Sequence, residues 1–298
     1  MDYLKGSNTR IYRLLDAERK AAENAISSSY PAVEWIDGHP IGNGDLGIMS
    51  LGSPEEFQFY LGKSNIWDDR TVAGNGSIYT PEPNSELIAI AKRGDGVEFN
   101  RINANSMVDY SSTNYPSPQS CGILSVKFSN PDYRKFTRIL ELDSGRDIVA
   151  WNTNTGTYKL SSWVHQDRNI TEINITYEDS ELNSLIISLG RMATDLYDPE
   201  CSFKTGGFLG FTFTFPGGFE YSNVITVQPH ESISIGENQF VLSKSPKCEL
   251  RLLQTIVTSE EAQDTQKTAV DRLKAFLKED QSRSIDVSTD YWRDFWSR

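Results

Sequence analysis

The feature that most constrains the fold is a succession of short strand patterns between residues 121 and 257. Apolar and polar residues alternate at 173–177 and 248–252, as in strands with one buried face. Clusters of Gly, Pro, Asn and Asp separate the segments. Many short strands with tight turns predict an all-β protein, a large antiparallel sandwich with peripheral helices. The candidate strands are 123–128, 136–142, 148–152, 157–164, 170–177, 184–189, 208–215, 224–227, 232–235, 239–242 and 248–257.

Residues 35–70 carry a hairpin pattern ahead of this series. Apolar runs at 46–51 and 57–61 flank a Gly-Ser-Pro loop, which predicts two paired strands. Polar turns precede the first run, at 39–45, and follow the second, at 62–65. If the strands pair, both turns lie at the same end and gather polar side chains at one rim of a sheet. The expected rim residues are His39, Asn43, Asp45, Asn65, Trp67, Asp68 and Asp69.

Amides and carboxylates around an exposed indole suit a sugar, which offers hydroxyl groups for hydrogen bonds and an apolar face for stacking. We therefore predict a carbohydrate-binding site made of His39, Asn43, Asp45, Asn65, Trp67 and Asp68. The competing interpretation is structural: the glycines satisfy special backbone angles and Trp67 fills the core. Composition alone favours the structural interpretation, because turns rich in Gly, Asn and Asp are common.

The motif Pro-Ile-Gly-Asn-Gly-Asp-Leu-Gly at 40–47, followed by an apolar strand and Trp67, resembles a known family. It is similar to the opening of the N-terminal β-sandwich in fucosidase-like glycoside hydrolases of family 95. Those fucosidases carry Asn-Glu-Asp before a Leu-Trp pair, where this chain has Gly-Lys-Ser-Asn-Ile-Trp at 62–67. The chain is therefore closer to the uncharacterised N-terminal domains of the same architecture.

The resemblance extends through residues 136–167, where one strand leads into two more. It implies a galactose-mutarotase-like supersandwich over residues 30–257, preceded by a helical lead-in over 1–29 and followed by a helical linker over 258–298. The positions that match are Arg138, Leu140, Leu142, Tyr158 and His165. In this resemblance they support the strands and have no chemical role.

The last forty or so residues change from strand to helix patterns. Thr258-Ser259-Glu260-Glu261 has the form of a capping box before an amphipathic helix, and a second helix is predicted from Asp290. Its Trp292, Phe295 and Trp296 resemble the linker that leads from the sandwich into an (α/α)6 barrel in these hydrolases. The resemblance implies that this barrel follows Arg298 and holds the catalytic carboxylates. No catalytic residue is therefore predicted in this chain, and the expected partners are the barrel and a carbohydrate.

The formal net charge of −12, with no dense run of Lys or Arg, argues against a nucleic-acid or membrane partner. The cysteines and histidines lack metal-binding spacing, so no metal or other cofactor is predicted. At most one disulfide can form, and buried free thiols are expected. No signal-peptide pattern opens the chain, whereas the resemblance implies an extracellular or periplasmic protein, so the location stays open. The three cysteines are Cys121, Cys201 and Cys248.

Weaker patterns occupy the remaining segments. Helical spacing at 10–26 predicts a leading helix, residues 87–92 read as a short strand, and residues 71–86 and 100–120 read as loops. The second loop is long enough to be functional, although a flexible surface loop is equally supported. Side chains there that could line a carbohydrate cleft are Asn103, Asn105, Asp109, Tyr110, Asn114 and Tyr115.

Three functions remain open from the sequence. The first is the non-catalytic N-terminal domain of a glycoside hydrolase, which packs on the barrel and lends loops to carbohydrate binding. The second is an autonomous carbohydrate-binding module. The third is a mutarotase-like sugar enzyme; such enzymes use a His pair and a Glu, and His165 and His230 are present, but no matching motif surrounds them.

Overall fold

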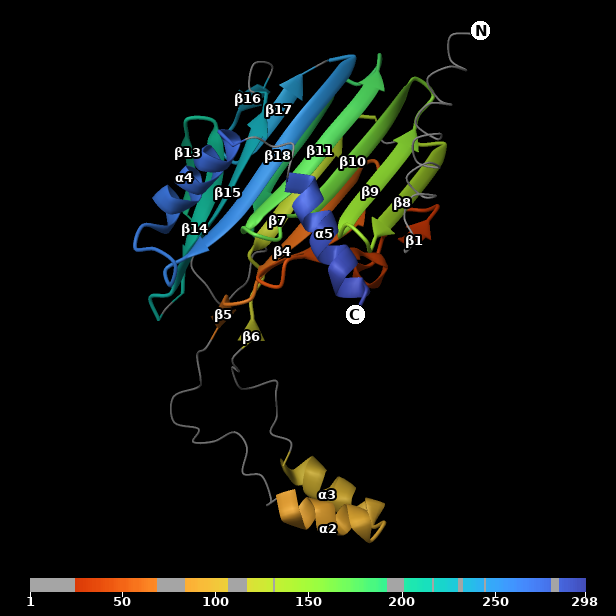
Figure 1. The fold of residues 1–298 in the computed structure, drawn as a ribbon, viewed down its shortest axis with the longest axis vertical. Coiled ribbons are helices and arrows are strands. Elements are labelled where there is room, and N and C mark those ends of the chain that lie inside the picture. The colour runs from red at the N-terminus through yellow and green to blue at the C-terminus, as the bar shows by residue number, and fades with distance from the viewer. Residues whose placement is uncertain are drawn as a thin grey trace. The chain divides into compact units, whose positions relative to one another are not determined.

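The computed structural model describes residues 25–68, 84–106, 117–130, 132–191, 201–215, 217–229, 233–243, 245–279 and 284–298. The chain divides into two compact units. The larger unit comprises Met1–Ile66 and Ser120–Arg298, and the smaller unit comprises Trp67–Gln119. In the larger unit, two antiparallel sheets lie face to face, with the helices α4 and α5 beside them (Figure 1).

One sheet of the larger unit has nine strands, in the order β1-β8-β9-β10-β11-β18-β15-β14-β13. Each neighbouring pair is antiparallel, as expected when strands are joined by short turns. The strands are β1 (Ala25–Ser28), β8 (Lys135–Glu141), β9 (Arg146–Asn152), β10 (Gly156–Val164), β11 (Ile170–Asp179), β13 (Cys201–Thr205), β14 (Phe208–Thr214), β15 (Glu220–Gln228) and β18 (Lys247–Thr258).

The other sheet has seven strands, in the order β16-β17-β12-β7-β4-β3-β2, and is also antiparallel throughout. The predicted hairpin is its β3–β4 pair, in which Leu46 lies opposite Lys63 and Gly52 opposite Phe57. The strands are β2 (His39–Gly42), β3 (Leu46–Gly52), β4 (Glu56–Lys63), β7 (Gly122–Phe128), β12 (Ser184–Gly190), β16 (Ile233–Ile235) and β17 (Gln239–Ser243).

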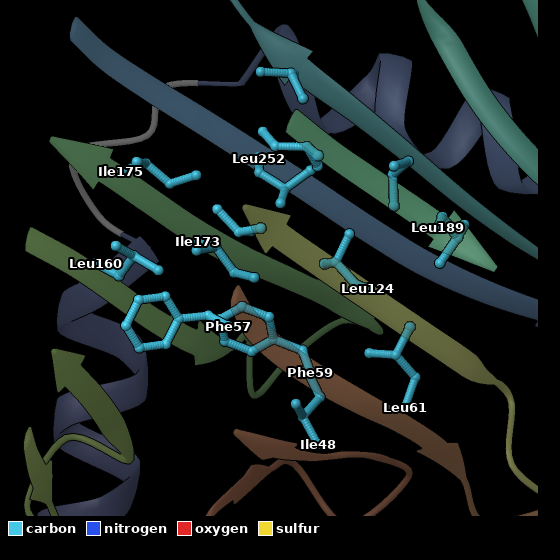
Figure 2. Close-up of a cluster of buried hydrophobic side chains, with 14 of the residues drawn as sticks. Ile48, Phe57, Phe59, Leu61, Leu124, Leu160, Ile173, Ile175, Leu189 and Leu252 are labelled. Atoms are coloured by element: carbon cyan, nitrogen blue, oxygen red, sulfur yellow. The ribbon is translucent and has the colours of Figure 1, made fainter. Parts of the chain in front are cut away.

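The hydrophobic core fills the space between the two sheets. Every second residue of β4 is buried, namely Phe57, Phe59, Leu61 and Lys63, because successive side chains point to opposite faces of a sheet. These rings and aliphatic chains meet residues such as Leu160 and Ile173 from the nine-stranded sheet (Figure 2). The prediction of a large antiparallel sandwich with peripheral helices is confirmed.

A second apolar layer lies on the outer face of the nine-stranded sheet. There α4 (Thr265–Leu277) packs on β14, β15 and β18, burying Leu273 and Phe276 against Phe208 and Leu253. The capping-box residue Thr258 is still in β18, paired with Tyr221, and its N–H donates to the Glu261 carboxylate at 2.9 Å. The helix therefore begins later than predicted.

Asp264 caps α4, since its Oδ1 accepts a hydrogen bond from the Lys267 N–H at 2.8 Å. The last helix, α5 (Ser284–Trp296), begins six residues before the predicted Asp290. Asp286 in its first turn suits the positive end of the helix dipole, which favours the earlier start.

The smaller unit corrects two predictions. Residues 87–92 belong to α2 (Asn84–Lys92), not to a strand, and residues 100–106 belong to α3 (Gly96–Ser106), not to a loop. Glu86 near the start, two alanines and Lys92 at the end favour a helix over an isolated strand. The helices contact each other with Ile90 and Ile102 buried. The unit also contains β5 (Trp67–Asp68) paired with β6 (Ser117–Pro118).

The predicted leading helix falls mostly on residues outside the described parts of the chain. Its last two residues, Ala25 and Ile26, are in β1, where they pair with Glu141 and Leu140 of β8. Residues 39–42, predicted as part of a turn, form β2, with η1 (Trp35–Asp37), a turn of 3-10 helix, just before it. Of the candidate cleft residues in the second loop, Asn103 and Asn105 are in α3, and residues 107–116 are not described.

Candidate functional site

The predicted polar rim forms at one end of the β3–β4 hairpin. Both polar turns lie there, because β3 begins opposite the end of β4. The turns are joined directly: the Ser64 N–H donates to the Asp45 carbonyl at 2.8 Å, and the Ser64 hydroxyl donates to Asp45 Oδ1 at 2.5 Å. The register of the hairpin therefore brings the rim residues of the two turns together.

Asn43 is fully engaged in hydrogen bonds within the protein. Its Oδ1 accepts from the N–H groups of Asp45 and Leu46, at 3.0 and 2.8 Å, which shapes the turn around Gly44. Gly44 has φ +92°, a conformation that glycine adopts without strain. The Asn43 Nδ2 donates to the carbonyls of His165 and Arg168 and to Asn169 Oδ1, at 2.9, 3.2 and 3.1 Å. Asn43 thus ties the turn to the loop that joins β10 to β11.

Asp45 is the centre of a charged network at the rim. Its Oδ2 accepts from Lys63 Nζ at 2.5 Å and from Asn169 Nδ2 at 2.6 Å. Burial opposes ionisation of the Asp45 carboxyl, but hydrogen bonds from Lys63, Ser64 and Asn169 outweigh it and lower the pKa. The Lys63 side chain is only 2% exposed, whereas that of Asp45 is 39% exposed. Asp45 therefore carries a negative charge that still reaches solvent.

The rim extends to the turn after β18. Lys63 Nζ lies 3.5 Å from Glu261 Oε2, and Arg272 of α4 donates to Glu261 Oε1 at 3.0 Å. Asn65 Nδ2 donates to Thr258 Oγ1 and Glu260 Oε2, at 3.1 and 2.7 Å. The sequence interpretation included Asn65 but missed Lys63 and Glu261, whose roles depend on bringing this turn to the hairpin.

His39 lies away from this rim. It opens β2, which runs antiparallel to β3, so His39 pairs with Ser50 at the opposite end of the hairpin. Its Nδ1 is 2.7 Å from Oδ1 of the buried Asp147, on β9 of the other sheet. The expectation that His39 joins the other residues at one rim is wrong, because residues 39–42 extend as a strand instead of folding back as a turn.

His39 lines a cavity of about 780 Å³ at the open edge of the sandwich. The cavity walls are mainly apolar and include Ile26, Leu140 and Trp292. The Trp292 indole packs over the turn between β8 and β9, where Gly145 has φ +63° and a Cβ would lie 2.1 Å from Trp292 Nε1. We call this space the edge cavity.

The model of the family described as glycosyl hydrolase family 65, N-terminal domain, matches residues 26–262. The chain belongs to this family. The family 65 domain match covers the two sheets, the rim and most of the edge cavity.

Two relatives of this chain are much longer proteins. A protein from Aspergillus oryzae named Probable alpha-fucosidase A is 26% identical over 150 residues, which covers 49% of this chain and 20% of that protein. A provisionally assigned kojibiose phosphorylase from the human microbiome has the same fold, with a TM-score of 0.58 and 12% identity. That match covers 92% of this chain and 38% of the phosphorylase chain. The chain thus spans well under half the length of either relative.

The family match confirms the coarser part of the sequence resemblance, namely the N-terminal domain of a glycoside hydrolase-type protein. The family that matches is family 65, whereas the sequence motifs pointed to family 95.

The remaining predicted site residues lie in the smaller unit. Trp67 is 47% exposed, so it does not fill the core as the structural interpretation expected, and it pairs with Pro118 in the β5–β6 ladder. Asp68 follows it in β5, and Asp69 lies outside the described residues. Binding of a carbohydrate by any of these residues stays a prediction.

Within the described ranges, no group of three or more His, Cys, Asp or Glu side chains is arranged to hold a metal ion. Cys248 has a free thiol, and burial raises the pKa of the Cys121 thiol to about 12. The described helices include none that is long and apolar enough to cross a membrane.

Replacing Asn43 with alanine in the family 65 domain is expected to lower the free energy of unfolding by about 2–4 kcal/mol, because partly buried carbonyl and N–H groups lose their partners. Urea unfolding followed by circular dichroism measures this loss. Asn130→Ala is the matched control, since Asn130 makes a single long bond of 3.4 Å to Asp179, and a loss below about 1 kcal/mol is expected there. Equal stability of Asn43→Ala and the parent chain would show that Asn43 is not a structural residue.

Proposed function

We propose that this chain is the non-catalytic N-terminal domain of a larger carbohydrate-active enzyme, and that it packs on a catalytic barrel and borders the carbohydrate-binding site. The observation that carries the proposal is the family 65 domain match over residues 26–262. The modest share of each relative that the chain spans supports a further domain in the whole protein. The relative named Probable alpha-fucosidase A agrees with the fucosidase part of the sequence resemblance.

The surface proposed to meet the barrel is an apolar patch around the edge cavity. Large side chains in the segment before β2 are mostly exposed, including Val33 at 81% and Ile36 at 83%. Tyr291, Phe295 and Trp296 of α5 are about half exposed, and both Ile36 and Trp296 line the cavity. Exposed apolar patches of this kind mark protein contacts, and the barrel that the family resemblance implies after α5 is the occupant to which we commit.

In this proposal some rim residues hold the turn in place and another contacts the sugar. Asn43 and Lys63 are satisfied within the protein and hold the turn in place, whereas the Asp45 carboxylate keeps an exposed side. Asp45 is therefore the rim residue proposed to accept a hydrogen bond from a sugar hydroxyl. Hydrolysis would proceed through the two carboxyl groups of the barrel, so no residue of this chain is assigned a chemical step.

The test is an assay of the complete gene product on a panel of α-linked sugars that includes fucosides and kojibiose, with and without inorganic phosphate. Cleavage of a glycosidic bond is expected from the complete protein and not from residues 1–298 alone. In the complete protein, the double variant Ile36→Asp with Trp296→Asp should lower the melting temperature and reduce kcat/KM at least about tenfold, since buried aromatic anchors dominate interfaces.

Val97→Asp is the matched control, because Val97 is 83% exposed on α3 in the smaller unit. It should leave both quantities unchanged. A complete protein that cleaves no bond in the panel, or a double variant that behaves like the parent, would contradict the proposal.

A further inference from the structure

A second cavity lies on the outer face of the nine-stranded sheet. Figure 1 shows α4 lying over β14, β15 and β18, and α5 in front of the same sheet at another place. The cavity, of about 650 Å³, is lined by residues of β9, β10, β11, β15 and β18. We call it the sheet-face groove. Its volume is in the range of small-molecule binding sites.

The pairing register arranges the groove floor as rows of neighbouring side chains. Ser161 of β10 lies opposite Asn174 of β11, and Asn174 lies opposite Arg251 of β18. Two residues further along β10, Trp163 lies opposite Glu172 of β11. Because these positions are two residues apart on each strand, all five side chains project from the same face.

Two buried polar atoms in this row have no hydrogen-bond partner among the described residues. They are the Trp163 indole Nε1 and the Ser161 hydroxyl, and their residues are 2% and 8% exposed. Buried donors are nearly always paired in native proteins, so two orphans on one strand and one face point to a ligand or water that completes them. Asn174 opposite Ser161 adds an amide with both a donor and an acceptor.

Two of the charged groups that line the groove, Arg251 and Glu172, form an ion pair with each other. Arg251 donates to both oxygens of Glu172, at 2.7 and 2.6 Å, and His165 Nε2 lies 3.1 Å from Glu172 Oε2. Phe276 of α4 packs against the His165 ring, and the Arg251 guanidinium lies over the Phe276 ring, 5.2 Å from its centre. Phe276 therefore closes the groove at the end where Arg251 and Glu172 lie. The floor thus offers uncharged donors and acceptors beside an aromatic wall.

We propose that the sheet-face groove binds a neutral carbohydrate through Ser161, Trp163 and Asn174. Hydroxyl groups of a sugar can accept from the indole and serine donors and can both donate to and accept from the amide. A phosphate or carboxylate ligand is best held by a cation without a carboxylate partner, whereas Arg251 is paired with Glu172 and Arg146, also in the lining, is paired with Glu141. This site goes beyond the proposed function, since it requires neither the rim nor a barrel.

The test is a titration of the ¹⁵N-labelled chain, observing the indole N–H resonances of its six tryptophans. The probes are maltotriose, cellotriose and xylotriose, with trigalacturonate and inorganic phosphate as charged comparisons. At least one neutral sugar should shift the Trp163 resonance to saturation. Ser161→Ala, followed by the Trp163 resonance, and Trp163→Phe, followed by calorimetry because it lacks that indole, should each weaken binding roughly threefold to tenfold, as loss of one hydrogen bond predicts.

Ser202→Ala is the matched control, because Ser202 is exposed on β13 of the same sheet, and its Kd should equal that of the parent. The proposal fails if no neutral sugar up to about 10 mM moves the Trp163 resonance, which would leave water as the partner of the orphaned atoms. It also fails if only the charged probes bind, or if both substitutions leave Kd unchanged. Even if one variant does not fold, the titration of the parent chain shows whether a neutral sugar binds beside Trp163.

Discussion

Replacing Trp151 with alanine is expected to lower the free energy of unfolding by about 3–5 kcal/mol, the range for deleting a buried aromatic side chain. Trp151 of β9 is 1% exposed and stacks on Tyr158 with 4.8 Å between ring centres. It also contacts Phe57 and Phe128 of the facing sheet, at 5.1 Å each. The substitution would therefore open a cavity where the two sheets meet.

Guanidinium unfolding of the Trp151→Ala variant measures the loss. Trp35→Ala is the control of equal size, because Trp35 is largely exposed and its ring meets the Tyr60 ring edge-on. Its cost should stay below about 1 kcal/mol. Similar losses in the two variants would show that the aromatic cluster of Trp151 does not bear on the stability of the sandwich.

Replacing Glu172 with glutamine is expected to cost about 2–4 kcal/mol at neutral pH, somewhat less than for a fully buried pair because the Arg251 side chain is 22% exposed. The change keeps the shape of the side chain but removes the charge that Arg251 pairs with through two short hydrogen bonds. Breaking a buried ion pair by neutralising one partner leaves the other charge without compensation. Glu249→Gln, on the exposed part of β18, is the control and should change stability by less than about 0.5 kcal/mol.

The Glu172 effect should depend on pH in a defined direction. Burial opposes ionisation, but hydrogen bonds from His165 and Arg251 prevail and lower the pKa of Glu172 below its ordinary 4.5. A carboxyl group with a lowered folded-state pKa contributes stability above its unfolded-state pKa and loses it as the pH falls through the folded-state value. The gap between parent and Glu172→Gln should therefore be largest above about pH 5 and narrow in acid. A constant gap between pH 7 and 3 would contradict this account.

The strands were predictable because their periodicity is local and strong. Alternation in β4 and β11, and turn residues such as Gly145, placed the hairpin and the series of strands correctly. The segment now seen as α2 was read as a strand because Ile88 and Ile90 alternate over too few residues to separate the two periods. The structure resolves the ambiguity by burying Ile90 against α3.

The candidate site was predictable only in part, because its contacts cross long stretches of sequence. The turns that carry Asn43 and Asp45 follow from the hairpin, but their partner Asn169 lies more than 120 residues away. His39 was misplaced because its histidine-proline pair suited a turn as well as the edge strand that forms. Sequence spacing does not reveal which distant turn meets a hairpin.

The two attachments of β2 bear on how this protein behaves at high concentration. His39 at one end is held by Asp147, and the Asn43 turn at the other end is held by the loop after β10. Between them, Pro40 lacks an N–H group, and β2 is the last strand on its side of the seven-stranded sheet. A short outermost strand that is fixed at both ends and interrupted by proline is a poor template for adding a strand from another molecule. The β2 edge of the seven-stranded sheet therefore disfavours self-association into extended β aggregates.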